Sequence, residues 1–124
     1  MAAVNIQNAS AVYLKSATVD LTTTSETSVL SNAISSGLLL KVDSIIVANI
    51  DGTTAYPITL TYHSAAALGG TSTIVASTIS VPANSSLVII DRTTAIYLEE
   101  NTSLGATAGT GSKLKVYCAY EQVS

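Results

Sequence analysis

The sequence predicts an all-β protein: a single antiparallel β-sandwich of about eight strands, jelly-roll or immunoglobulin-like, with a short N-terminal arm. Apolar residues alternate with Ser, Thr and other polar residues at a period of two, and turn residues recur about every 8 to 12 residues. Only 10% of the 124 residues are charged, against roughly 25% in ordinary soluble domains. The chain is instead rich in Thr, Val and Ile, which favour strands.

The N-terminal part divides into an arm and the start of the sandwich. Residues 1–10, "MAAVNIQNAS", show no clear period and are expected to form an extended arm, followed by a β-sandwich domain over 11–124. Two short strands are expected over 11–15 and 18–22. Two interpretations of residues 25–34 stay open. Their apolar residues have helical spacing with Ser25 as a cap, and the segment fits a strand with a loop equally well.

The stretch "KVDSIIVANIDGTTAYPITLTYHS" (41–64) predicts a hairpin. A long strand over 38–50 and a half-buried strand over 58–64 flank Asp51-Gly52, a strong hairpin signal that is expected to fix the register. The side chains expected to build the core here are Ile46, Ala48, Ile58, Leu60 and Tyr62.

The C-terminal half predicts further strands and turns. Residues 65–73 are expected to form a flexible loop, Pro82 to end the following strand, and "GTGS" to close a last hairpin. The strands are expected over 74–81, 87–90, 95–100, 104–108 and 113–123. In the last strand the residues expected to point into the core are Leu114, Val116, Cys118 and Tyr120.

Charge and hydropathy exclude several classes of partner. The net charge is −3 and the five basic residues are dispersed, so we expect no nucleic-acid binding. No apolar run approaches the roughly 20 residues that span a bilayer, so we expect no membrane partner. The N-terminus lacks the pattern of a signal peptide. With the single Cys118, which excludes an internal disulfide, this predicts synthesis and assembly in a cytoplasm.

The sequence contains no pattern for catalysis, and we expect no enzyme. His63, the only His, lies on the polar phase of a strand and is expected to be exposed and without function. Cys118 lies on the core phase and is expected to be a buried, inert thiol. Glu99 and Glu100 are expected to point to opposite faces of a strand end, so they cannot act together on one substrate.

Metal, cofactor and sugar sites also lack support. Asp43, Asp51 and Asp91 do not form a calcium-binding loop, and Asp51 is better explained as a turn residue. We therefore assign no catalytic, cofactor-binding or metal-binding residue and expect no cofactor. Tyr62 and Tyr120 fall on core phases. The four tyrosines that can be exposed fit the rims of the sheets best, subunit contacts next and sugar binding least: Tyr13, Tyr56, Tyr97 and Tyr117.

Three stretches of the chain resemble a known family. "LLLKVDSIIVANIDGTTAYPITLTYHS", "STISVPANSSLVIIDRTTAIYLEENTSLGATA" and the C-terminal "LKVYCAYEQVS" are similar to small virion structural proteins of tailed, especially marine, bacteriophages. The resemblance covers about residues 38–124 and, weakly, 12–30. It departs from the family pattern at "LEENTSL", where a Gly is expected before Ser-Leu.

The resemblance implies a non-enzymatic β-sandwich subunit that is present in many copies on a phage particle. The first expectation is a capsid decoration or cement protein that bridges neighbouring capsid subunits. A head–tail junction (neck) or tail component is the alternative, and a host-surface glycan-binding module is the third. The implied partners are the major capsid protein or other virion subunits, in a homo-oligomer or many copies. The expected location is the virion, assembled in the host cytoplasm. The segments expected to touch neighbours are residues 1–10, the Asp51–Pro57 turn and the 65–72 loop.

Overall fold

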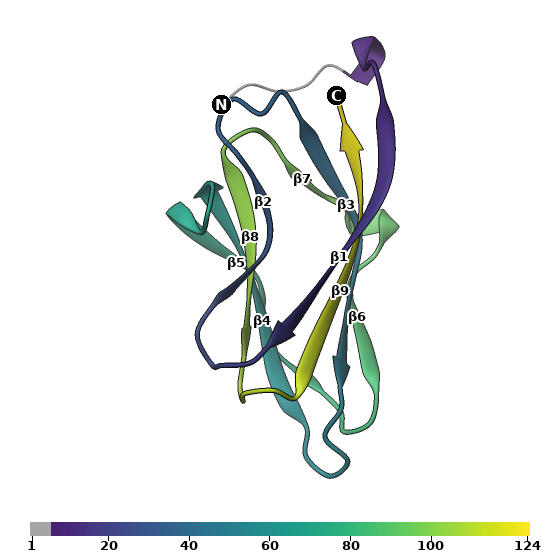
Figure 1. Ribbon diagram of the computed structural model, residues 1–124. Helices are drawn as coiled ribbons and strands as arrows, with labels where there is room; N and C mark the ends of the chain where they lie inside the picture. The colour runs from purple at the N-terminus through teal and green to yellow at the C-terminus, as the bar shows by residue number, and fades with distance from the viewer. Residues whose placement is uncertain (1–5) are drawn as a thin grey trace.

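The computed structural model describes residues 6–124, which form two antiparallel β-sheets packed as a sandwich (Figure 1). The five-stranded sheet has the order β1-β9-β3-β6, with β7 also paired with β3, and the four-stranded sheet has the order β2-β8-β4-β5. The predicted all-β sandwich is confirmed. Its strands are β1 (Val12–Leu21), β2 (Thr27–Asn32), β3 (Leu39–Asn49), β4 (Tyr56–Ala65), β5 (Gly69–Val81), β6 (Ser86–Ile90), β7 (Ile96–Leu98), β8 (Thr102–Ala108) and β9 (Leu114–Val123). Two single turns of 3-10 helix complete the elements: η1 (Ile6–Asn8) and η2 (Arg92–Thr94).

Most connections lead from one sheet to the other. Among strands that follow one another in the described chain, only β4 and β5 are hydrogen-bonded neighbours. The predicted hairpins at Asp51-Gly52 and at "GTGS" are therefore wrong, because β3 and β4, and likewise β8 and β9, belong to different sheets. In each case two strands with one apolar face place those faces against each other across the core, instead of lying side by side.

Asn49 and Asp51 redirect the chain between the sheets. The buried amide of Asn49 donates to the carbonyl oxygens of Thr54 (2.9 Å) and Val81 (3.0 Å), and its oxygen accepts from the N–H of Asp51 (2.9 Å). The Asp51 carboxylate accepts from the N–H groups of Thr53 (2.8 Å) and Thr54 (3.0 Å). The turn role predicted for Asp51 is confirmed. This turn carries the chain from one sheet to the other. It does not fix a strand register, because β3 and β4 do not pair.

A bulge in β3 changes which side chains reach the core. The pairing of β3 with β9 shifts around Asp43, which adds one residue to β3. Because side chains alternate, one extra residue sends every later side chain to the other face. Ile45 and Val47 are therefore fully buried, whereas Ile46 and Ala48, which the sequence placed in the core, lie half-buried on the outer face.

The other residues predicted to build the core are in it or pack against it. Ile58 and Leu60 are fully buried, and Tyr62 packs against the core partly exposed. The inward-pointing residues predicted for β9 are confirmed. Leu114, Val116 and Cys118 are buried, and Tyr120 is partly exposed but packs against the core. The core lies between the two sheets and draws on both, so it holds the layers together through apolar burial.

Three segments differ in extent from the prediction. Residues 12–21 form one strand, because β9 continues the same register from Val12 to Leu21. Residues 27–32 are the strand β2, so of the two interpretations of 25–34 the strand is correct. The loop expected over 65–73 is only a tight turn, because β5 begins at Gly69.

The two ends of the described chain meet. The N–H groups of Ser10 and Ala11 donate to the carbonyl oxygen of Ser124, and the N–H of Ser124 donates back to Ala11. The predicted arm (1–10) falls partly outside the described residues, and within them Ile6–Asn8 form η1. Between residues 6 and 124 no helix is long and apolar enough to span a membrane.

Candidate functional surfaces

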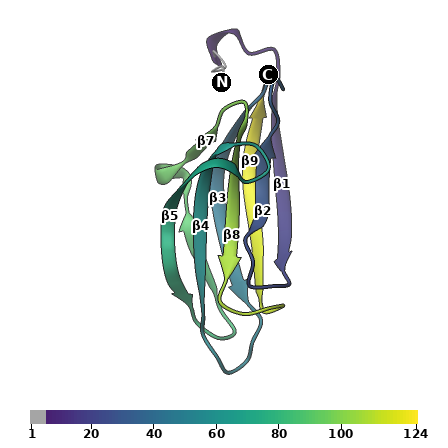
Figure 2. The same ribbon diagram turned by 90° about the vertical axis from the view of Figure 1, so that its left-hand side faces the viewer.

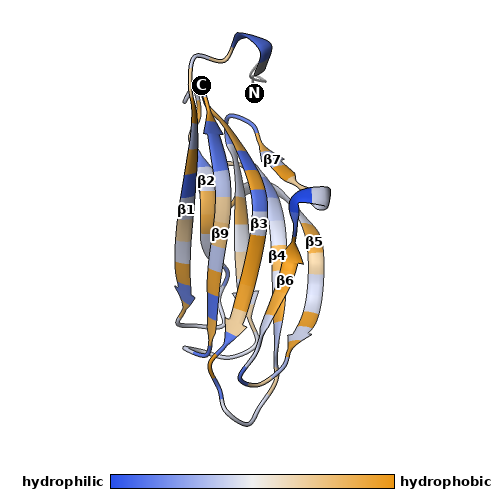
Figure 3. Ribbon diagram, turned by 90° about the vertical axis from the view of Figure 1, so that its right-hand side faces the viewer, coloured by the Kyte–Doolittle hydropathy of each residue, from blue (hydrophilic) through white to orange (hydrophobic). Residues whose placement is uncertain are grey.

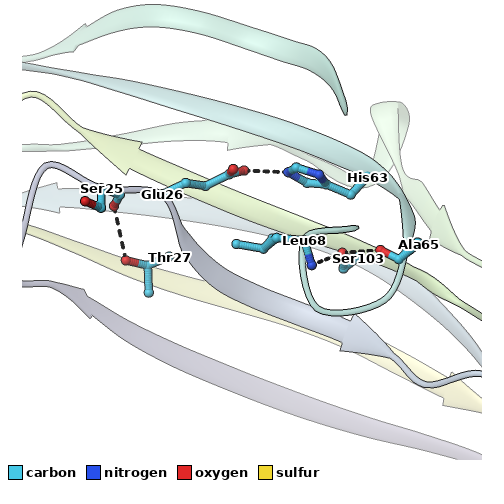
Figure 4. A network of polar contacts seen from close by, with 7 residues as sticks. All are labelled: Ser25, Glu26, Thr27, His63, Ala65, Leu68 and Ser103. Atoms are coloured by element: carbon cyan, nitrogen blue, oxygen red, sulfur yellow. Dashed lines mark hydrogen bonds and ion pairs between the residues drawn. The ribbon is translucent and has the colours of Figure 1, made fainter. Parts of the chain in front are cut away.

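Glu26 and His63 form a buried pair on the outside of the four-stranded sheet. His63 on β4 is only 6% exposed, and its Nε2 lies 2.7 Å from Oε2 of Glu26, which directly precedes β2 (Figure 4). The Glu26 side chain reaches across β8 at Gly105, where no side chain stands in the way. The prediction that His63 is exposed is therefore wrong. Its strand phase was assigned correctly, but Glu26 covers that face.

The hydroxyl of Ser103, next to His63, is hydrogen-bonded to the backbone of the 65–68 turn. Ser103 lies opposite His63 on β8. Its hydroxyl donates to the carbonyl oxygen of Ala65 (2.7 Å) and accepts from the N–H of Leu68 (2.9 Å) (Figure 4). Ser103 thus fastens the 65–68 turn to the sheet. The buried Nδ1 of His63 has no hydrogen-bond partner among the described residues. Through the contact of Nε2 with Glu26, the pair connects β4, across β8, to the residue before β2.

The surroundings of Cys118 disfavour its thiolate form. It lies fully buried in the core on β9, as predicted. Burial, with a smaller contribution from the Asp43 charge, raises the pKa of the thiol to about 12. Because the thiolate is the reactive form, we expect this thiol to resist reaction at neutral pH in the folded protein.

The acidic residues singled out from the sequence serve turns or lie apart. Hydrogen bonds from Thr53 and Thr54 hold the pKa of Asp51 below its usual value, and bonds from Thr93 and Thr94 do the same for the pKa of Asp91 at η2. No three His, Cys, Asp or Glu side chains gather as a metal site in the described part of the chain.

The Glu99-Glu100 pair lies outside any strand. Strand β7 ends at Leu98, so both residues belong to the turn that leads to β8, and the strand-end placement is wrong. The carbonyl oxygen of Glu99 accepts from the Thr102 hydroxyl (2.7 Å), which closes this turn.

The charges are unevenly distributed between the two sheets. The four strands of the four-stranded sheet contain no Lys, Arg, Asp or Glu. We call its outer side the uncharged face (Figure 2). Strand register places there Ser28, Thr59, Thr61, His63, Ser72, Ile74, Ser103, Gly105 and Thr107. Glu26, paired with His63, is the acidic group that reaches onto this face.

The strands of the five-stranded sheet carry hydrophilic residues among the apolar ones (Figure 3), and five of their six charged side chains form ion pairs with one another. Lys41 lies 3.7 Å from Asp43 and 3.5 Å from Glu121, and Lys115 lies 3.2 Å from Asp20. The outer side of this sheet also has an open hollow of about 760 Å³. Its lining includes Leu14, Ser16, Asp43, Arg92 and Tyr117.

The tyrosines divide largely as the sequence indicated. Tyr13, Tyr97 and Tyr117 are exposed, whereas Tyr56 is half-buried against the core. Tyr97 and Tyr117 both lie on the outer side of the five-stranded sheet, where their partners are Lys41 and Ile46 on β3. Tyr97 and Tyr117 are therefore exposed on the same face of the sheet but lie opposite different residues of β3.

Of the segments predicted to touch neighbours, one is folded onto its own sheet. The N–H groups of Ala66, Ala67 and Leu68 donate to Asn101, Ser31 and Ser103. The 65–68 turn therefore covers one end of the uncharged face. At the other end of the sandwich, Thr53 and Thr54 of the Asp51–Pro57 turn are exposed. Their contact with neighbours stays a prediction.

Comparison with known proteins shows the fold. No family matches the sequence, and no curated protein matches it. A chain of the Bacillus endospore appendages, which form disulfide-linked pili, is similar over 100% of this chain and 96% of its own, with 13% identity and a TM-score of 0.53. A chain of the T13 IBDV viral particle, an icosahedral virus, is similar over 99% of this chain and 35% of its own, with 8% identity and a TM-score of 0.50.

These similarities identify a jelly-roll-like β-sandwich, and both proteins are subunits of many-copy assemblies. The chain spans about a third of the viral protein that it matches. A third similarity, to the CBM22-1 and GH10 modules of a Clostridium thermocellum xylanase, has a TM-score of 0.38 and is too distant to support an argument.

Proposed function

We propose that the chain is a non-enzymatic structural subunit of a tailed-phage virion, and specifically a capsid decoration or cement protein. It binds the outside of the head in many copies and bridges neighbouring capsid subunits. It is assembled in the host cytoplasm and ends in the virion. Its partner is the major capsid protein, and its task is mechanical: to hold adjacent subunits together against the pressure of the packaged DNA.

The observation that carries the proposal is the uncharged face. Charged side chains keep soluble surfaces apart and resist desolvation. A sheet whose strands hold none of them presents Ser, Thr and Ile side chains, which cost less to desolvate than charged side chains do. The Glu26–His63 pair keeps the acidic group on this face in contact with a partner of its own.

Two further observations support an assembled subunit. The structurally similar proteins belong to pili and to an icosahedral viral particle, and the sequence resembles small phage virion proteins along most of its length. Cys118 is buried, so contacts between subunits do not use a disulfide bond through this residue.

Binding to capsids tests the proposal. Ile74 on the uncharged face and Val88 on the outer side of the five-stranded sheet are 58% and 56% exposed, so they make a matched pair. Purified protein is mixed with expanded capsids that lack it, and bound protein is measured after sedimentation. Ile74→Glu should lower capsid affinity by at least about tenfold, because it buries a charge, whereas Val88→Glu should leave it nearly unchanged.

Two results would contradict the proposal. Absence of binding by the unaltered protein would remove the decoration role. Equal affinity of the Ile74→Glu and Val88→Glu variants would remove the uncharged face as the contact. Thermal melts of both variants check that each remains folded.

A further inference from the structure

The sandwich has two long open edges, and only one of them is protected. Strand β5, at the edge of the four-stranded sheet, shifts register against β4 three times, and Thr78 within it has a positive φ of 43°. Bulges of this kind twist an edge away from other strands and are a common protection against pairing. Strand β1, at the edge of the five-stranded sheet, has no such break. Its register with β9 is regular from Val12 to Leu21.

The unprotected edge is also apolar at one end. Val12, Tyr13 and Leu14 follow one another on β1 and are 54%, 57% and 80% exposed. Consecutive residues point to opposite faces of a sheet, so apolar side chains stand on both sides of this edge. A ten-residue strand with open backbone groups and large apolar side chains on both faces is the pattern that recruits another strand.

We propose that β1 pairs antiparallel with β1 of a second copy across a two-fold axis, so that two five-stranded sheets become one continuous sheet. A second copy is the occupant because the strand is compatible with itself. Residues that lie opposite each other across such an axis must share a face. The two registers with the longest overlap therefore place Ser16 or Ala17 on the axis.

Both registers avoid contacts between like charges directly across the seam. Lys15 lies opposite Ala17 or Val19 of the second copy, and Asp20 lies opposite Val12 or Leu14. Like charges directly opposite each other would destabilise the pair. In either register, Leu14 lies directly or diagonally beside Asp20 of the second copy.

The seam is long enough for a specific contact. Nine of the ten residues of each β1 overlap, which gives a seam of roughly 30 Å. Such a pairing forms about eight to ten backbone hydrogen bonds, similar to the number in a typical protein interface. The hollow on the outer side, which Leu14 and Ser16 line, reaches this edge and continues into the second copy. The inference stands on the edge alone and does not depend on which particle holds the subunit.

Charges of opposite sign, introduced in turn at the exposed Leu14, test the pairing in solution. Leu14→Asp places a carboxylate beside Asp20 of the second copy, twice by symmetry, whereas Leu14→Lys places an ammonium group there. Lys115 lies 3.2 Å from Asp20 within each copy and reduces, without removing, the difference between the two variants. Both variants remove the same apolar side chain. Sedimentation-velocity ultracentrifugation from 1 to about 100 µM should show a dimer for the unaltered protein. Leu14→Asp should raise its dissociation constant at least about threefold more than Leu14→Lys, because exposed charge pairs contribute modestly.

Controls separate pairing from folding. Val88→Asp and Val88→Lys, on exposed positions of β6, should leave the dimer unchanged, and thermal melts confirm that every variant is folded. A monomer at all concentrations would overturn the inference, even if the protein bound to capsids. Equal weakening by Leu14→Asp and Leu14→Lys would also overturn it, since that result indicates general apolar contact.

Cysteine cross-linking locates the axis. Cys118 is buried, so a cysteine introduced at Ser16, which is exposed, or at Ala17, which lies half-buried against the core, is the more accessible thiol. One of these variants should form a disulfide-linked dimer on mild oxidation, visible on a non-reducing gel. Val88→Cys should remain a monomer under the same conditions. A linked dimer for Val88→Cys alone would place the contact at another edge and contradict the β1 pairing.

Discussion

A methyl group at Gly105 should break the Glu26–His63 pair. A Cβ atom at this position would lie 2.8 Å from Cδ and 2.9 Å from Cγ of Glu26, and closer still to its Oε2. Carbon atoms do not approach so closely. In the Gly105→Ala variant, the Glu26 side chain must therefore swing outward. His63 then stays buried without its 2.7 Å contact.

The expected loss has two opposing parts. A hydrogen bond that involves a charged group contributes about 1.5–3 kcal/mol, and a buried group left without a partner costs a similar amount. Replacing Gly by Ala restores about 0.4–1 kcal/mol, because the unfolded chain has less freedom. The free energy of unfolding should therefore fall by about 1–2 kcal/mol, which lowers the melting temperature by roughly 3–10 °C for a domain of this size.

The same substitution should have the opposite sign when Glu26 is shortened. In a Glu26→Ala background, the three atoms that lie nearest to a Cβ at residue 105 are absent, so Gly105→Ala should be neutral or stabilising by up to about 1 kcal/mol. Urea unfolding of the wild type, both single variants and the double variant, at one protein concentration, measures the coupling. Additive effects in the two backgrounds would refute the account of how Glu26 reaches His63.

Three further predictions concern the core and the crossover. Cys118 should resist iodoacetamide at pH 8 in the folded protein, because burial raises the pKa of its thiol to about 12. It should react at once when urea unfolds the chain. Rapid labelling of the folded protein would contradict its buried position. Asn49→Ala should lower the free energy of unfolding by about 2–3 kcal/mol, because the buried carbonyl oxygen of Val81 and the partly buried carbonyl oxygen of Thr54 lose their donor. A loss below about 0.5 kcal/mol in urea unfolding would contradict this role. Asp51→Ala should destabilise the protein at pH 7 but progressively less below pH 3.8. The folded-state pKa of Asp51 is held below that value, so the contribution of its carboxylate is present above 3.8 and is lost as the pH falls through the folded-state pKa. A thermal-stability difference from wild type that stays the same from pH 7 to pH 2 would argue against this.

The strands were predictable, but their partners were not. Alternation of apolar and polar residues located β3, β4, β6, β8 and β9 to within two residues at each end, because a half-buried strand must alternate. Asp51-Gly52 was assigned to a hairpin, since that signal describes only the local turn. Whether two strands lie side by side or face to face depends on the sandwich as a whole. Here the side chain of Asn49 holds the crossover through hydrogen bonds to Thr54 and Val81, a contact that the local sequence pattern does not reveal.

The bulge and the buried histidine show why part of the surface was hidden from the sequence. Asp43 looks like any polar residue of a strand, yet it is the extra residue that reverses the faces of Ile46 and Ala48. Glu26, His63 and Gly105 are far apart in the chain and meet only in the folded sheet. The one available signal was Gly105 itself, because a glycine within a strand often marks a close approach by another group.

The central claim is that this chain is a mechanical subunit of the phage head, present in many copies. Quantitative mass spectrometry of purified virions, with isotope-labelled peptides of this chain and of the major capsid protein, tests it most directly. The proposal predicts hundreds of copies per particle, in a fixed ratio to the capsid protein. A count of about six to twelve would instead indicate a closed neck or tail ring, and absence from the virion would contradict the structural role altogether.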